Sequence, residues 1–266
     1  MTAPFASTAP YYARYRPPYP VEFHALLADR FALDGSQTVL DLGTGPGTIA
    51  LPLAPAVDHV YAVDPEPAML AEGVRLAQER GCANISWLRG VAADVTRLCL
   101  PRIDLCVIGE AFHRMDRARV PADLDAVLAP RGGIALITRT AGPDAPRPPW
   151  TAVVDEVCAR YLGPDYRAAR AVAAQRAGDP DDLGDMLAKS PFSRVESAAW
   201  EQSVVLTPDQ VVGLQLSYAH CGPALFGDRK DAFASDVRRA LLDHDPGGRY
   251  TWTVPVAVTV ATRPRR

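Results

Sequence analysis

Residues 38–47 read Thr-Val-Leu-Asp-Leu-Gly-Thr-Gly-Pro-Gly. This stretch is the strongest indication of the fold in the sequence. The first five residues are mostly apolar and predict a buried strand. Glycines at 43, 45 and 47 let the backbone turn tightly and approach a ligand closely. We expect a helix around residues 48–53, whose free N–H groups would face that ligand. A strand, a glycine-rich turn and a helix in this order are typical of a nucleotide-binding loop.

The spacing within this loop narrows the choice of ligand. A dinucleotide-binding loop reads G-x-G-x-x-G, whereas the third glycine here, Gly47, arrives one residue early. Asp41 would repel a pyrophosphate and suits a cationic or hydrogen-donating ligand better. Asp64 ends the next predicted strand, 21 residues after Gly43 (64 − 43), where a carboxylate can accept hydrogen bonds from both ribose hydroxyls. The pattern favours a ribose with an amino-acid head group and disfavours a nicotinamide-dependent reductase.

Short apolar segments alternate with helical patterns on both sides of the loop. The periodicity predicts further strands at 59–64, 84–88, 103–108 and 133–138, and helices at 21–31, 67–80 and 120–128. Continuous apolar strands that alternate with helices indicate a parallel sheet covered on both faces. We therefore expect a doubly wound α/β fold.

The alternation stops after about residue 140. Residues 150–176 read as helical with a break near 163–164, residues 178–184 as an acidic flexible link, and 208–220 and 229–244 as helices. Segments 195–206 and 250–260 are expected to return to the sheet as antiparallel strands. The proline-rich residues 11–20 predict an extended arm. The expected division is an arm over the cofactor site at 1–20, a core at 21–141, an inserted helical lid at 142–190 and a part completing the sheet at 191–266.

Composition excludes several functional classes. The 266 residues carry a formal net charge of −3 without a basic run, which disfavours nucleic acid as a partner. Five unclustered cysteines predict neither a disulfide framework nor a metal site. No apolar stretch reaches the roughly 18 residues of a membrane span, so we expect a cytoplasmic protein without a membrane partner. A homo-oligomer is the default expectation on general grounds.

The stretch 41–47 together with Asp64 resembles the first two motifs of class I S-adenosylmethionine-dependent methyltransferases. The resemblance is clear over residues 10–140 and weaker over 190–262. It implies a Rossmann-like, seven-stranded sheet with S-adenosyl-L-methionine across the carboxyl ends of the first strands. The cofactor-binding residues implied near its methionine part, ribose and adenine are Asp41, Gly43, Thr44, Gly45, Gly47, Asp64, Pro65 and Met69.

Two later segments continue the resemblance. Residues 92–94 (Ala92, Ala93 and Asp94) match the adenine-side segment in position, although relatives often carry an acid where this chain has Ala93. Residues 110–113 resemble the A-F-H segment of the family. The resemblance implies that Glu110 and Ala111 contact the cofactor, and that Phe112 and His113 contact the acceptor.

The tyrosine-rich arm resembles that of a subgroup which methylates small acids, sugars and natural products, and there the arm folds over the cofactor. The resemblance implies that Tyr11 and Arg16 contact the methionine carboxylate, since a guanidinium pairs well with a carboxylate. Tyr15 and Tyr19 would then contact the acceptor.

The function expected from these residues is methyl transfer to a hydroxyl or amine of a small molecule, a natural product or its biosynthetic intermediate, as in antibiotic biosynthesis. An imidazole titrates near neutrality, so His113 can serve as a general base, or it can merely orient the cofactor. Two alternatives keep the same cofactor site. One is an enzyme that catalyses a cyclisation or rearrangement, and the other is a non-catalytic cofactor-binding protein.

Overall fold

The computed structural model describes residues 5–139, 147–176 and 180–264, and these form two compact units. The sheet unit comprises residues 18–140, 177–200 and 255–266. The helical unit comprises residues 1–17, 141–176 and 201–254. Each unit is assembled from three separate stretches of the chain.

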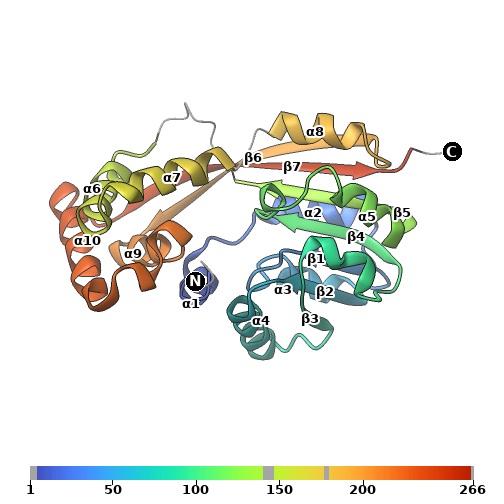
Figure 1. Cartoon of the computed structure of the whole chain (residues 1–266), viewed down its shortest axis with the longest axis horizontal. Coiled ribbons are helices and arrows are strands. Elements are labelled where there is room, and N and C mark those ends of the chain that lie inside the picture. The colour runs from blue at the N-terminus through green and yellow to red at the C-terminus, as the bar shows by residue number, and fades with distance from the viewer. Residues whose placement is uncertain (1–4, 140–146, 177–179, 265–266) are drawn as a thin grey trace. The chain divides into compact units, whose positions relative to one another are not determined.

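The strands are β1 (Thr38–Leu42), β2 (His59–Asp64), β3 (Ile85–Arg89), β4 (Ile103–Gly109), β5 (Leu128–Thr138), β6 (Arg194–Leu206) and β7 (Tyr250–Thr262). They form one seven-stranded sheet in the order β3-β2-β1-β4-β5-β7-β6 (Figure 1). The first five strands pair in parallel, and β7 returns antiparallel to β5. The doubly wound, seven-stranded architecture predicted from the sequence is therefore confirmed.

Both faces of the sheet are buried. On one face α2 (Val21–Arg30) and α3 (Ala50–Leu53) bury Phe23, Leu27 and Leu53 against alternate residues of the strands. On the other face α5 (Val120–Val127) and α8 (Pro180–Ala188) bury Leu124 and Leu187. This two-sided burial explains why the parallel strands read as continuous apolar runs.

The helix α4 (Pro67–Arg80) follows β2 with the bounds that the sequence predicts. Glu66 is its N-cap and accepts a hydrogen bond from the N–H of Ala68, and Pro67 occupies its first turn. Gly81 ends the helix with a φ of 68°, a conformation that glycine adopts without strain.

The helical unit contains α1 (Ala9–Tyr15), α6 (Trp150–Leu162), α7 (Pro164–Arg176), α9 (Pro208–Leu216) and α10 (Lys230–His244). Its core is rich in aromatic rings, and Phe226 stacks on Phe233 at 4.1 Å between centroids. The indole of Trp150 donates to the carbonyl of Thr251 over 2.9 Å. The predicted break between α6 and α7 is confirmed at Gly163, whose φ is 74°.

Three expectations about local structure are wrong. Residues 9–15 form α1 and not an extended arm, because Pro10 lies in the first turn, where a proline is tolerated, and the remaining prolines follow the helix. Residues 180–188 form α8 and not a flexible link, because Leu183 and Leu187 are buried; residues 178 and 179 lie outside the described residues. β5 begins at Leu128 and not at 133, with an irregular register opposite Ile103 and Leu105.

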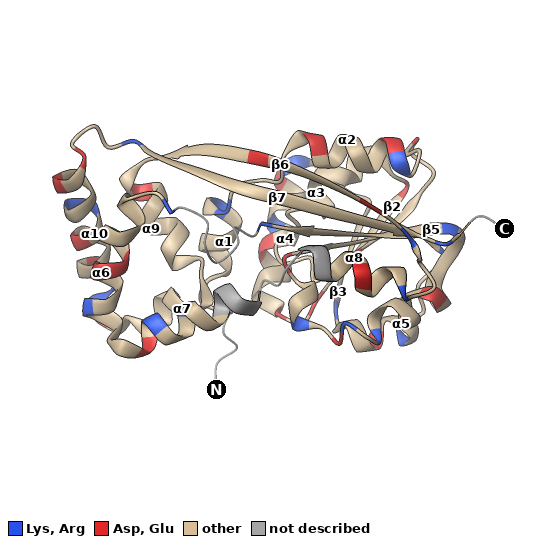
Figure 2. Ribbon diagram, turned by 90° about the horizontal axis from the view of Figure 1, so that it is seen from above, with Lys and Arg blue, Asp and Glu red and all other residues tan. Residues whose placement is uncertain are grey.

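The helices differ in the sign of the charged residues that they carry. Acidic and basic residues are interspersed along α10, whereas the only charged residues of α5 are Asp123 and Asp125 (Figure 2). The expectation that nucleic acid is not a partner stays a prediction. Within the three described ranges, no helix is long and apolar enough to cross a bilayer.

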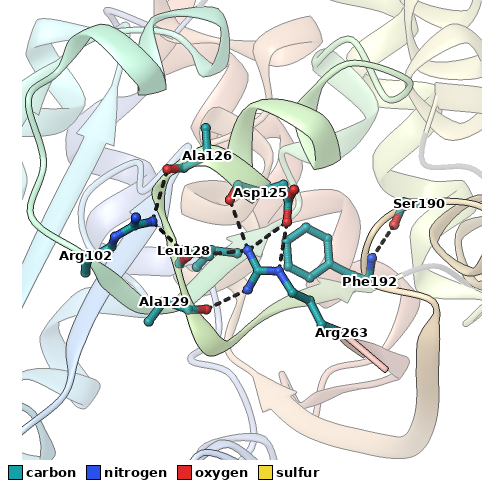
Figure 3. A network of polar contacts seen from close by, with 8 residues as sticks. All are labelled: Arg102, Asp125, Ala126, Leu128, Ala129, Ser190, Phe192 and Arg263. Carbon is teal, nitrogen blue, oxygen red and sulfur yellow. Dashed lines mark hydrogen bonds and ion pairs between the residues drawn. The ribbon is translucent and has the colours of Figure 1, made fainter. Parts of the chain in front are cut away.

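An arginine after β7 ties that strand to the end of α5 and the start of β5 (Figure 3). Arg263 donates from Nε to Asp125 Oδ1 over 2.8 Å and from Nη1 to the carbonyl of Ala129 over 2.6 Å. Its guanidinium also lies over the ring of Phe192, 4.9 Å from the centroid. Nearby Arg102 donates from Nη1 to the carbonyls of Ala126 and Leu128.

Candidate active site

The glycine-rich turn after β1 is held against β2. The N–H groups of Gly43 and Thr44 both donate to the carbonyl of Val63, over 2.8 and 3.0 Å. Gly43 has a φ of 78°, and a Cβ there would lie 2.5 Å from the Cβ of Ala111. Gly45 also has a positive φ, but a Cβ there would meet nothing within 4 Å. The turn is thus packed at Gly43 and open beside Gly45.

Asp41 lies beneath this turn and is 1% exposed. Its Oδ2 accepts hydrogen bonds from Thr44 Oγ1 over 2.7 Å and from the N–H of Ala50 over 3.0 Å. Its Oδ1 is buried without a hydrogen-bond partner in the described part of the chain. Burial raises the pKa of the Asp41 carboxyl to about 7, against the opposing effect of the two hydrogen bonds and with a contribution from the charge of Asp64. A cation nearby would favour the ionised form.

Asp64 joins the turn to the end of β2. Its Oδ2 accepts from the N–H of Gly45 and its Oδ1 from the N–H of Glu66, each over 2.9 Å. Burial raises the pKa of this carboxyl, while the same hydrogen bonds oppose the rise. Each oxygen keeps a second lone pair that can accept from a ligand hydroxyl.

Two neighbours of the site were not predicted from the sequence. Glu66 is 8% exposed and places a third carboxylate beside Asp64; its position just before Pro67 marks it as an N-cap, which is the signal that could have found it. Trp87 packs where a Cβ of Gly47 or Gly73 would lie 2.5 or 2.2 Å from its ring. No local pattern in the sequence pairs Trp87 with these two glycines.

The ends of β4 and β5 bring the later predicted residues together. Glu110 has a φ of 53°, and its Oε1 accepts from the N–H of Arg139 over 2.5 Å. His113 lies in the short 3-10 helix Phe112–Arg114. Glu110, Ala111, His113 and Thr138 share the lining of one small pocket. Phe112 also lines it, but is only 4% exposed and packs in the core.

The residues predicted for the adenine side lie on two elements. Pro65 is exposed at the turn before α4, and Met69 is buried within α4. Ala92, Ala93 and Asp94 begin the 3-10 helix Ala92–Arg97, where Asp94 Oδ2 accepts from the N–H of Val91 over 3.2 Å. Their contacts with a cofactor stay predictions.

The predicted residues of the arm divide between the two units. Tyr19 belongs to the sheet unit and is 6% exposed. Tyr11 and Tyr15 stack on each other in the helical unit. Arg16 donates from Nε to Ser217 Oγ over 2.9 Å and lies 4.0 Å from the ring centroid of Tyr218, all within that unit. Their proposed roles at the cofactor and the acceptor stay predictions.

Sequence comparisons find a family and several proteins that are similar to this chain. Residues 39–132 match a family model described as a methyltransferase domain. An uncharacterised methyltransferase of Mycobacterium bovis is 28% identical over 83% of this chain and 79% of its own length. Methyltransferase cfoB of Aspergillus candidus is 27% identical over 71% of this chain and 58% of its own length.

Solved structures share the fold. A protein of Anaeromyxobacter dehalogenans described as a type II methyltransferase superposes with a TM-score of 0.59 at 24% identity, covering 94% of this chain and 98% of that one. The YcgJ protein of Bacillus subtilis gives a TM-score of 0.53 at 18% identity, covering 91% of this chain and 100% of that one. Residues 39–132 are therefore similar to a methyltransferase domain, the relatives are described as methyltransferases, and the solved structures share the fold of this chain.

Proposed function

We propose that this protein transfers the methyl group of S-adenosylmethionine to a hydroxyl or amine of a small molecule, a natural product or its biosynthetic intermediate. The observation that carries the proposal is the pair of buried carboxylates, Asp41 and Asp64, which flank the open position at Gly45. The chain's lack of a basic run favours a small acceptor over nucleic acid.

The residues fit S-adenosylmethionine. A cationic ligand is favoured beside two carboxylates, and the buried Asp41 Oδ1 has no partner in the described residues to offset its charge. Asp64 and Glu66 can accept hydrogen bonds from ribose hydroxyls. The space beside Gly45 lets a ligand approach the backbone directly.

S-adenosylmethionine, when bound, supplies a sulfonium methyl group. The protein must hold the acceptor atom in line with that group and exclude water, since orientation can provide much of the acceleration. In the transfer the methyl–sulfur bond breaks, a methyl–oxygen or methyl–nitrogen bond forms, and the acceptor loses a proton. We assign the role of proton acceptor to His113, and its position in the lining of the pocket after β4 supports this assignment.

The first test is calorimetric titration with S-adenosylmethionine and, separately, with NADH. We expect micromolar binding of S-adenosylmethionine only, lost in Asp64→Ala and kept in Asp123→Ala, a control that removes a carboxylate of α5 paired with Arg119. If the wild-type protein, freed of co-purified ligand, binds no S-adenosylmethionine, the proposal is wrong.

A second measurement separates transfer from rearrangement. Incubation with S-adenosylmethionine and candidate hydroxyl and amine acceptors should give products heavier by one methylene unit. A product of unchanged mass would instead indicate the cyclase or rearrangement chemistry that the same cofactor site allows.

A further inference from the structure

The guanidinium of Arg139 lies outside the glycine-rich turn and lacks hydrogen-bond partners for two of its buried nitrogens. Arg139 directly follows β5 and is partly buried. Its Nε and Nη2 are both shielded from solvent, and neither has a hydrogen-bond partner among the residues that the structure describes. Buried donors are nearly always paired, and charged donors most of all, so this arrangement is costly unless a ligand completes it.

The two unpaired nitrogens form one edge of the guanidinium. Nε–H and one N–H of Nη2 point in the same direction and are separated by about the distance between the two oxygens of a carboxylate. This edge therefore offers a bidentate pair of charge-assisted hydrogen bonds. A planar carboxylate matches it better than a hydroxyl or an amide, each of which presents one acceptor oxygen.

Arg139 is held in place by an aromatic ring and by a hydrogen bond from its backbone N–H. Its Cζ lies 4.1 Å from the ring centroid of Tyr19, a buried residue whose ring packs in turn on Phe23. Gly109 leaves room for the hydroxyl of Tyr19, which would lie 2.6 Å from a Cβ at that position. Glu110 accepts from the N–H of Arg139. Such support preorganises a charged group for binding.

The strand order places Arg139 away from the ribose side of the site. Asp64 ends β2 and Asp41 lies in β1, whereas Arg139 follows β5 in the order β2-β1-β4-β5. With neighbouring strands about 4.8 Å apart, Arg139 lies on the order of 10 Å from β1 and 14 Å from β2 along the edge of the sheet. Between them, at the end of β4, lies the segment with Glu110 and His113.

We propose that Arg139 binds a carboxylate of the methyl acceptor, and hence that the acceptor is a small organic acid. This inference rests on the proposed function, because it takes the ends of β4 and β5 as the acceptor side of a methyltransferase site. The carboxylate of the cofactor's methionine part has the same chemistry, and the experiment distinguishes the two sources.

The test compares acids with their amides. The protein, alone and saturated with S-adenosylhomocysteine, is titrated with benzoate against benzamide and with succinate against succinamide, and binding is followed by NMR. We expect the wild-type protein to bind at least one acid about tenfold more tightly than its amide. Arg139→Gln should abolish this preference, and Arg75→Gln, which removes an exposed arginine of α4, should keep it.

Arg139→Lys provides a second variant should Arg139→Gln fail to fold. It keeps the charge and the aliphatic stem but cannot form the bidentate pair, so most of the preference should be lost. Absence of any acid preference in the wild-type protein, or a preference that survives both substitutions, would overturn the proposal.

The cofactor is tested in the same variants. If S-adenosylmethionine binds about tenfold more weakly to Arg139→Gln and no acid is preferred over its amide, the guanidinium holds the cofactor and the acceptor assignment is wrong. Failure of S-adenosylmethionine to bind the wild-type protein is a separate outcome. It overturns the proposed function, while the titrations of the ligand-free protein still report on the anion site.

Discussion

The N–H of Gly45 donates to Asp64 Oδ2 over 2.9 Å, which fastens the turn after β1 to the end of β2. The other oxygen of the same carboxylate accepts from the N–H of Glu66, at the start of α4. One side chain thus orders two backbone segments that face the proposed ligand. The glycines of the turn differ in what they contribute to this arrangement, and that difference can be measured.

Alanine substitutions at Gly43 and Gly45 should have different effects. Both positions have positive φ, which costs a residue with a side chain about 1 kcal/mol. At Gly43 the new Cβ would also meet Ala111 at 2.5 Å, and such overpacking adds roughly 1–3 kcal/mol. Urea denaturation should therefore show a larger loss for Gly43→Ala. At Gly45 the main loss should be in the affinity for S-adenosylmethionine, because a methyl group would enter the open side. Equal losses of stability would contradict the packing at Gly43.

The stability of the folded chain should fall as the pH rises between about 4 and 7 because of Asp41. Its folded pKa of about 7 lies above the usual 3.8, so the folded state holds a proton that the unfolded state has released. The contribution of this proton to the free energy of unfolding is roughly 4 kcal/mol below pH 3.8. This contribution is lost as the pH rises past 7. Asp41→Asn should flatten this part of the profile. An unchanged slope in Asp41→Asn would show that the carboxyl is ionised throughout.

Replacement of His113 tests its role as a base. If it accepts the acceptor's proton, His113→Ala should lower kcat by about 100-fold, because general bases typically contribute 10²–10⁴. The affinity for S-adenosylmethionine should stay unchanged, and the acidic limb of the pH–rate profile should disappear. Methylation within a few-fold of wild type would leave His113 with an orienting role only.

Arg263 and Arg102 both bond groups near the start of β5, so their substitutions can be compared to measure what one carboxylate contributes to stability. Arg263 bonds a carboxylate and several carbonyls, whereas Arg102 bonds two carbonyls through one nitrogen (Figure 3). Arg263→Ala should lower the free energy of unfolding by about 2 kcal/mol, and Arg102→Ala by about half as much. Denaturant titrations that gave equal effects would mean that the carboxylate contributes nothing at Arg263.

The parts of the fold that the sequence predicted are those with local causes. The helix 67–80 follows from its N-cap, its proline and its C-terminal glycine, and the turn at 43–47 follows from glycine spacing. The prediction of an extended arm is wrong because the effect of each proline depends on its position relative to α1. Pro10 lies in a first turn, and only the residues after Arg16 are extended. The helix α8 was missed because burial of Leu183 and Leu187 against other strands decides its structure.

In the site, too, features with local causes could be predicted and features that depend on long-range contacts could not. Asp41 and Asp64 are found from the sequence because each lies in or at the end of an apolar strand beside the turn. The contact between Trp87 and two glycines, and the stacking of Arg139 on Tyr19, join residues that are distant in sequence and follow no local period. The raised pKa of Asp41 depends on its complete burial, which only the packed sheet provides.

The pairing of β7 with β5 has a consequence for the order in which the chain is made. Residues 257–262 cover the outer edge of β5, but they are synthesised only after residues 201–254 of the helical unit. Until then a growing chain can carry five parallel strands whose last member exposes unpaired backbone groups. Exposed strand edges pair readily with other chains. During synthesis the sheet unit is thus nearly folded for a time while it is still prone to self-association. A chain truncated before residue 257 would keep the exposed strand edge.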